Sequence, residues 1–160
     1  MKTENSVPID LETLQTLIHE VLIEHKTLAQ FKQMSSFELD DTYRQALIYY
    51  QNHDMPEALS HFTYLVMHDP WQFEFMFGLA STLHALNQFE SALVFYGYAT
   101  LMNACDAGVT FRIGQCYLSL GKTEPSISAL QTSIEQSYLP PIQLDVRVLA
   151  QSLLDEIVQY

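Results

Sequence analysis

The sequence contains little glycine, few basic residues and no long apolar run. Its 160 residues include 5 Gly, 2 Cys and 7 Lys and Arg together. Scarce glycine disfavours a β-rich fold, because tight turns between strands depend on Gly. No window approaches the roughly 18 to 20 uninterrupted apolar residues of a membrane helix, so we expect no membrane insertion.

The charge balance is strongly acidic. The 7 basic residues face 19 acidic ones, which gives a formal net charge of -12. A nucleic-acid binder needs Lys and Arg to neutralise phosphates, and an anionic membrane surface repels an acidic chain. We therefore expect neither partner. Acidic charge does keep exposed apolar surface in solution, and it can attract a basic partner.

The polar residues show no pattern typical of catalysis. Cys105 and Cys116 form no CxxC pair and the N-terminus has no secretion signal, which predicts a reduced, cytoplasmic protein with both cysteines buried. The spacing of His61, His68 and His84 is not that of a metal site. Because the sequence has no catalytic triad and no Gly-rich phosphate loop, we predict no enzyme, no metal and no cofactor.

Three stretches align without a gap at a spacing of 34 residues, beginning at Leu39, Phe73 and Ala107. Small residues recur at the eighth and twentieth positions, and larger ones at the twenty-fourth. These residues are Ala46, Ala80 and Gly114, then Ala58, Ala92 and Ser126, then Phe62, Tyr96 and Leu130. The period and the pattern are typical of the tetratricopeptide repeat, a helix–turn–helix unit that stacks into a solenoid. Such solenoids bind partners on a concave surface.

The periodicity divides the chain into three parts. Residues 1–34 are predicted to form a tail and amphipathic helices, residues 35–140 the three repeats, and residues 141–160 a C-terminal capping helix. A terminal helix with a polar outer face covers the last apolar surface of a solenoid. The predicted fold is therefore an all-α, right-handed solenoid of three repeats, flanked by an N-terminal amphipathic helical region and the capping helix.

Capping signals predict where several helices begin and end. Ser35 followed by Glu38 fits a capping box at the start of the first repeat. Asp54 and Asn87 each stand three residues before a Glu, so we expect them to cap the second helices of the first two units. Gly121 suits the left-handed end of a helix.

Several stretches resemble the class II chaperones of bacterial type III secretion, which hold two hydrophobic translocator proteins before export. The matching stretches are Leu39-x-x-x-Tyr43-x-x-Ala46-x-x-Tyr49-Tyr50, Ala58-Leu59-x-x-Phe62-x-x-Leu65, Asp69-Pro70-Trp71, Phe75-x-Phe77-Gly78-Leu79-Ala80, Ala92-Leu93-x-x-Tyr96-x-Tyr98-Ala99-x-x-Met102 and Gly114-Gln115-Cys116-Tyr117-Leu118. The resemblance covers roughly residues 10–158 and extends to the acidic balance. Ser126 and Ser133 stand where the repeat family commonly has Ala, so the third unit departs from the family pattern at these core positions.

The resemblance to the repeat family also predicts a groove, since the second, fifth, ninth and twelfth positions of each first helix turn toward the concave side. The predicted peptide-binding residues are Tyr43, Leu47, Tyr50, Phe77, Ser81, His84, Phe111 and Gln115. The fifth position is aromatic in all three units, which suits an extended peptide with apolar side chains. The alternative is that these rings belong to the core between repeats or are covered by the N-terminal helix. Some tetratricopeptide domains hold a C-terminal carboxylate with a Lys and Asn clamp; the equivalent positions here carry no cation, which argues against that ligand.

The chaperone resemblance implies a function. It implies a cytoplasmic bacterial chaperone that keeps hydrophobic translocators, the secreted pore-forming subunits, soluble and competent for secretion. It also implies a homodimer in the absence of a client, formed through the apolar stripe Leu11, Leu14, Ile18 and Leu22. The alternative function is a tetratricopeptide scaffold or regulatory adaptor that joins folded proteins.

Overall fold

The computed structural model describes residues 15–16, 19–20 and 24–158, and within these residues the only regular elements longer than two residues are helices. The helices are α2 (Leu28–Phe31), α3 (Ser36–Gln51), α4 (Met55–His68), α5 (Phe73–Ala85), α6 (Phe89–Met102), α7 (Ala107–Ser119), α8 (Thr123–Gln136) and α9 (Leu144–Val158). The all-α prediction is confirmed. None of the described helices has both the length and the apolar composition needed to cross a membrane.

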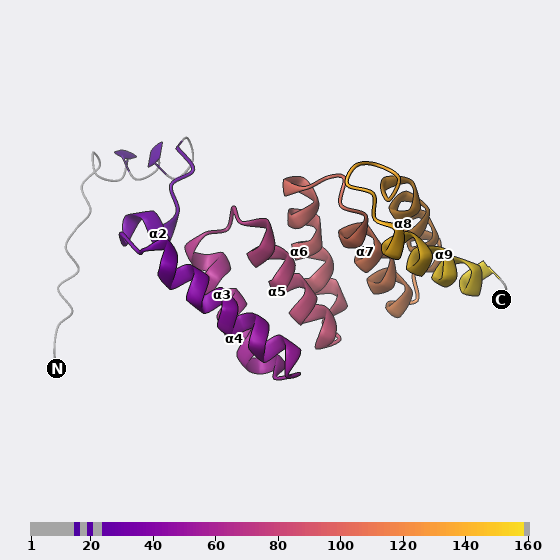
Figure 1. Ribbon diagram of the computed structural model, residues 1–160, viewed down its shortest axis with the longest axis horizontal. Coiled ribbons are helices and arrows are strands. Elements are labelled where there is room, and N and C mark those ends of the chain that lie inside the picture. The colour runs from indigo at the N-terminus through magenta and orange to yellow at the C-terminus, as the bar shows by residue number, and fades with distance from the viewer. Residues whose placement is uncertain (1–14, 17–18, 21–23, 159–160) are drawn as a thin grey trace.

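The helices form a row of stacked pairs. Figure 1 shows the pairs α3–α4, α5–α6 and α7–α8 following one another from the N-terminal to the C-terminal side of the molecule. From α3 onward, each helix packs against the next one in the chain, α2 packs against α4, and α9 packs against both α8 and α7. The three pairs coincide with the three 34-residue units, so the predicted repeat array is confirmed.

Small residues stand where the two helices of a unit cross. The eighth- and twentieth-position residues, including Ala46, Ala58, Ala80 and Ala92, are buried without exception. A Cβ at the equivalent Gly114 would lie 3.0 Å from the side chain of Leu130. The backbones therefore approach closely because these positions carry almost no side chain, and the large twenty-fourth-position residues fill the space beside them.

The third unit buries two serines at positions that pack against the facing helix. The Ser126 hydroxyl donates to the carbonyl oxygen of Gly114 at 2.8 Å, and the Ser133 hydroxyl donates to that of Ala107 at 2.8 Å. Both serines are completely buried. Because each buried hydroxyl has an acceptor on the facing helix, the polar atoms are satisfied and both serines belong to the core of the third unit.

The turns within the units share a backbone geometry that the capping prediction missed. His53, Asn87 and Gly121, spaced by 34 residues, have positive φ angles of 60°, 59° and 69°. Gly121 confirms the expected left-handed helix end. Asn87 does not cap α6, because it occupies the left-handed position that the turn requires, a conformation that Asn tolerates. Asp54 does stand at the N-cap of α4, but its side chain accepts no backbone hydrogen bond there.

The capping box at the first repeat forms as predicted. The Glu38 amide donates to Ser35 Oγ at 3.3 Å, and the Ser35 amide donates to Glu38 Oε2 at 3.0 Å. These two bonds satisfy donors that have no partner within the helix, and they fix the start of α3 at Ser36. The start of α3 matters because this helix supplies one wall of the site described below.

The last helix covers the end of the array only on one side. Ala150 of α9 is buried in a cluster with Phe111 and Leu130 of the third unit. On the other side of α9, Leu144 and Val148 remain exposed. The outer face is therefore not polar at these positions, unlike the face expected of a terminal helix.

Candidate peptide-binding groove

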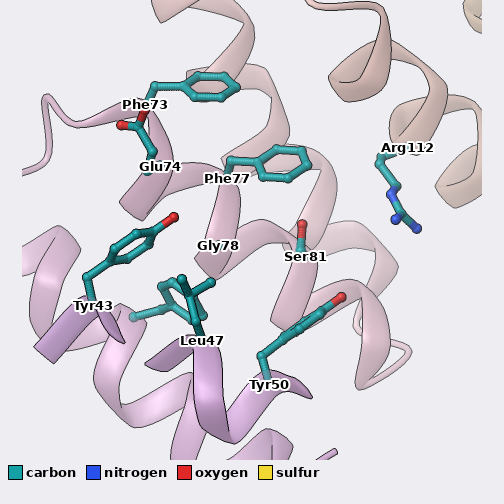
Figure 2. Close-up of a pocket in the computed structure, with 10 residues that line it drawn as sticks. Tyr43, Leu47, Tyr50, Phe73, Glu74, Phe77, Gly78, Ser81 and Arg112 are labelled. Carbon is teal, nitrogen blue, oxygen red and sulfur yellow. The ribbon is translucent and has the colours of Figure 1, made fainter. Parts of the chain in front are cut away.

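A cavity of about 250 Å³ lies mainly between α3 and α5, the first helices of two successive units. Most of its lining side chains are aromatic or aliphatic, and a few polar ones stand at its edges. The lining residues are Tyr43, Leu47, Tyr50, Phe62, Phe73, Glu74, Phe77, Gly78, Ser81 and Arg112. Figure 2 shows the rings of Tyr43, Phe77 and Tyr50 around this space.

Contacts between rings hold the aromatic lining in place. Phe73 and Phe77, one turn apart on α5, stack with centroids 5.7 Å apart and an interplanar angle of 12°. Phe77 also lies 5.9 Å from the ring of Tyr96, and Tyr43 lies edge-on to Phe62 at 6.2 Å. Rings fixed in this way present apolar area to a ligand without a large loss of side-chain entropy on binding.

The Tyr43 hydroxyl stays protonated at neutral pH. Partial burial raises the pKa of Tyr43 above its ordinary value, and the nearby Glu74 carboxylate raises it further. The neutral hydroxyl can both donate and accept a hydrogen bond. The groove wall can therefore bond a peptide backbone group at this point as well as contact apolar side chains.

The far end of the cavity rests on a buried polar cluster. The Tyr96 hydroxyl donates to Ser81 Oγ at 3.3 Å, and His84 Nδ1 lies 3.4 Å from the Tyr96 oxygen and 3.5 Å from Cys116 Sγ. Burial lowers the pKa of His84, and the Arg112 charge lowers it further. Burial also raises the pKa of the Cys116 thiol to about 11.

These two shifts oppose an imidazolium–thiolate pair, which a nucleophilic cysteine needs. The cluster around His84 therefore holds Tyr96 and Ser81 through polar contacts, and it does not activate Cys116 as a nucleophile. Within the described residues, no three metal-ligating side chains come together either. The cavity can therefore bind apolar groups, and the hydrogen-bonding and charged side chains at its edges can bind polar groups of the same ligand.

The structure brings together most of the predicted groove residues. Tyr43, Leu47, Tyr50, Phe77 and Ser81 all line the cavity. His84 is half-buried behind Ser81, in the polar cluster.

The two predicted groove residues of the third unit lie elsewhere. Phe111 is only 8% exposed and packs with Leu130 and Ala150 in the cluster under α9. Gln115 accepts a long hydrogen bond of 3.4 Å from Arg112 and does not line the cavity. Phe111 is therefore a core residue, as the alternative interpretation of the aromatic fifth position predicted.

Two other sequence predictions concern cysteines and the N-terminal region. Cys116 is buried as expected, but Cys105 is exposed because it lies in the turn between α6 and α7. The predicted dimer stripe, Leu11, Leu14, Ile18 and Leu22, lies outside the described residues.

The sequence analysis missed lining residues at the sixth position of the units. Gly78 and Arg112 both stand there, one residue after the aromatic fifth position. On α5, Glu74, Phe77, Gly78 and Ser81 follow the i, i+3, i+4, i+7 spacing of one helix face, which is the signal that could have found the sixth position. The cavity therefore does contain a cation, Arg112, although the positions equivalent to the carboxylate clamp carry none.

Stacked helix pairs with an apolar cavity between first helices are the architecture expected of tetratricopeptide repeats. No model of a known protein family matches the chain. The low calcium response locus protein H of Yersinia pestis is 26% identical over 121 residues, which are 76% of this chain and 72% of that protein.

Solved structures share the fold over most of the chain. A type III secretion complex from Aeromonas hydrophila contains a chain with a TM-score of 0.82 and 24% identity, covering 90% of this chain and 96% of that one. SycD of Yersinia enterocolitica, in complex with a peptide of the translocator YopD, has a TM-score of 0.73 and 25% identity, covering 79% and 96%. The chain is thus similar in sequence and in fold to translocator chaperones of type III secretion, which confirms the resemblance seen in its motifs.

Proposed function

We propose that this protein is a chaperone of a type III secretion system that binds an extended segment of a hydrophobic translocator in the cavity between α3 and α5. The observation that carries the proposal is the cavity itself, walled by Tyr43, Leu47, Tyr50 and Phe77. An extended segment places alternate side chains on one side, so its apolar residues can enter such a cavity while its backbone stays accessible.

The similar structure of SycD supports this reading, since it was solved with a peptide of the translocator YopD. In our proposal the chaperone acts in the bacterial cytoplasm, without catalysis, by covering apolar segments of a client. The net charge of -12 would keep the complex in solution.

We also propose a separate role for each of the three parts of the chain. Residues 35–140 would hold the client, residues 141–160 would cover the end of the array, and residues 1–34 would form a homodimer when no client is bound. A structure of SycD described as an alternative dimer supports self-association in a similar protein. Sedimentation of the full chain with and without client tests this part separately from the groove.

Co-expression with a translocator from the same secretion gene cluster tests the groove. We expect the unaltered chain to co-purify with the translocator, and the double variant Tyr43→Ala, Phe77→Ala to lose it. Circular dichroism checks that the variant keeps its helical content. Tyr98→Ala is the matched control, because Tyr98 is exposed on α6 and does not line the cavity.

If the folded double variant binds the client as well as the unaltered chain does, the cavity is not the client-binding site. The state of the client separates the proposal from the scaffold alternative. A client captured only as an unfolded chain supports the chaperone, whereas a client captured only in its folded state supports a scaffold or adaptor.

A further inference from the structure

The guanidinium of Arg112 lines an apolar cavity and has no carboxylate partner among the described residues. It comes from α7, in the third unit, whereas the rings of the groove come from the first two. Its one hydrogen bond is a 3.4 Å contact with Gln115 Oε1 on its own helix. The two ion pairs in the described part of the chain, His19–Glu24 and Lys26–Glu20, lie far from it in sequence.

Arg44 also has no carboxylate partner among the described residues, but it does not line the cavity. Arg112 is the cation that the cavity lining contains. The charge of Arg112 acts instead on groups that are neutral at pH 7, namely the half-buried His84 and the buried Tyr96 and Cys116. Its five donors are therefore largely free to bind a ligand.

A carboxylate stands at the other side of the same cavity. Glu74 lies beside Tyr43 and Phe73, and it forms no ion pair with the described residues. Figure 2 shows Glu74 and Arg112 on opposite sides of the Phe77 ring. The hollow that adjoins the cavity at Tyr43 and Glu74 adds Asp40 and Asp69, so this end is negative and the Arg112 end is positive.

We propose that Arg112 and Glu74 fix the direction of the bound segment. An acidic side chain of the client pairs with Arg112, its apolar side chains occupy the space between Tyr43 and Phe77, and a basic side chain lies toward Glu74. This inference rests on the proposed function and specifies its ligand: an extended apolar segment with an acidic residue on one side and a basic residue on the other.

The chemistry of Arg112 favours a carboxylate over other partners. Its planar fork binds a carboxylate through two parallel hydrogen bonds, which are stronger than bonds between neutral groups. An apolar side chain alone gives no preference between the two directions of an extended chain, because backbone donors and acceptors alternate in both. Opposite charges at the two ends make one direction favourable and the reverse unfavourable.

Selection of random linear dodecapeptides by surface display tests the inference on the full chain. Peptides are selected in parallel on the unaltered protein, on Arg112→Glu, on the exchange variant Glu74→Arg, Arg112→Glu, and on Arg44→Glu. Arg44 is the matched control, because it holds the same sixth position in the first unit, is exposed and does not line the cavity. It changes the net charge as Arg112→Glu does.

We expect the unaltered protein and Arg44→Glu to select apolar peptides with an acidic residue on one constant side. The exchange variant should select peptides with the order of charges reversed. For one selected peptide, fluorescence anisotropy should show about threefold to tenfold weaker binding when its acidic residue becomes Gln, since Arg112 is exposed to solvent. In the variant Arg112→Gln, the same change in the peptide should raise the dissociation constant about twofold or less.

Two outcomes would overturn the inference in different ways. Apolar peptides selected without a charge preference, or with one that Arg112→Glu leaves unchanged, would remove the directional role and keep the apolar groove. A library that yields no apolar peptide on the folded protein would remove the groove and the proposed function together.

Discussion

The ring of Phe62 occupies the space where a side chain at position 78 would lie. A Cβ built on Gly78 overlaps the Phe62 ring, and Phe62 itself is only 1% exposed and cannot move outward freely. The same ring lines the cavity. The absence of a side chain at Gly78 therefore allows α4 to contribute an aromatic floor to a groove whose walls come from α3 and α5.

Gly78→Ala should destabilise the protein and reduce peptide binding. The added methyl group displaces the Phe62 ring within a packed core, and overpacking of this kind costs about 1–3 kcal/mol. Urea denaturation measures the loss of unfolding free energy. Gly97→Ala is the control, because a Cβ there meets nothing within 4 Å, and Ala in a helix is about 0.5–1 kcal/mol more favourable than Gly. Equal effects of the two substitutions would contradict this account of Gly78.

Leu130→Ala should cost far more stability than Leu101→Ala. Leu130 is fully buried where Gly114 lets α7 and α8 meet, whereas Leu101 is 83% exposed on α6. Truncation of a buried Leu leaves a cavity and costs about 2–5 kcal/mol, while an exposed Leu changes stability by about 0.5 kcal/mol or less. Denaturant unfolding monitored by circular dichroism compares the two. A small loss at Leu130 would mean that the third unit collapses around the gap.

The native protein should expose one reactive thiol at pH 8. Cys105 is exposed, whereas Cys116 is buried and its thiol pKa is raised to about 11, so little Cys116 thiolate exists at that pH. Titration with a chromogenic disulfide should give one equivalent in buffer and two in denaturant. Cys105→Ser should give no equivalent until the protein unfolds. Rapid reaction of Cys116 in the native state would show that its surroundings open readily.

His84 should make the protein less stable as the pH falls below about 6.5, the ordinary pKa of histidine. Its pKa is lowered in the folded state, first by burial and then by Arg112, so the unfolded chain binds a proton at a higher pH than the folded one. The stabilising contribution is complete above the unfolded pKa and is lost as the pH falls toward the folded pKa.

Unfolding free energies between pH 7.5 and 5.5 test this dependence. The unaltered chain should lose more stability over that range than His84→Gln, which removes this titration and leaves the other histidines. An NMR titration should also show the His84 pKa moving up toward its ordinary value in Arg112→Gln, because one of the two causes of the shift is gone. Identical pH profiles for the two proteins would rule out the assigned role of His84.

The repeat columns could be predicted because they depend on contacts inside each unit. Ala58 and Ala92 are buried for the same reason, since each stands where the second helix crosses the first. The capping box at Ser35 was equally accessible, because its partners are three residues apart. The small-residue columns and this capping box were therefore read correctly from the sequence.

Features that depend on the neighbouring element could not be read in the same way. Phe111 holds the same column as Tyr43 and Phe77, but α9 follows the third unit and covers its ring. Asn87 matches the spacing of a helix cap, yet the turn needs a left-handed residue at that place. Arg112 reaches the cavity from the third unit, and a column assigned within one unit does not reveal a side chain that reaches across to another.

The cavity draws its lining from all three units, with Tyr43 and Phe62 in the first, Phe77 in the second and Arg112 in the third. In an array stabilised by nearest-neighbour contacts, the end units can open independently of each other. A segment bound across the cavity would contact all three at once, and mass action would then favour the state in which none is open. A bound segment would thus couple the opening of α3 to that of α7. Binding would then slow amide hydrogen exchange in both helices.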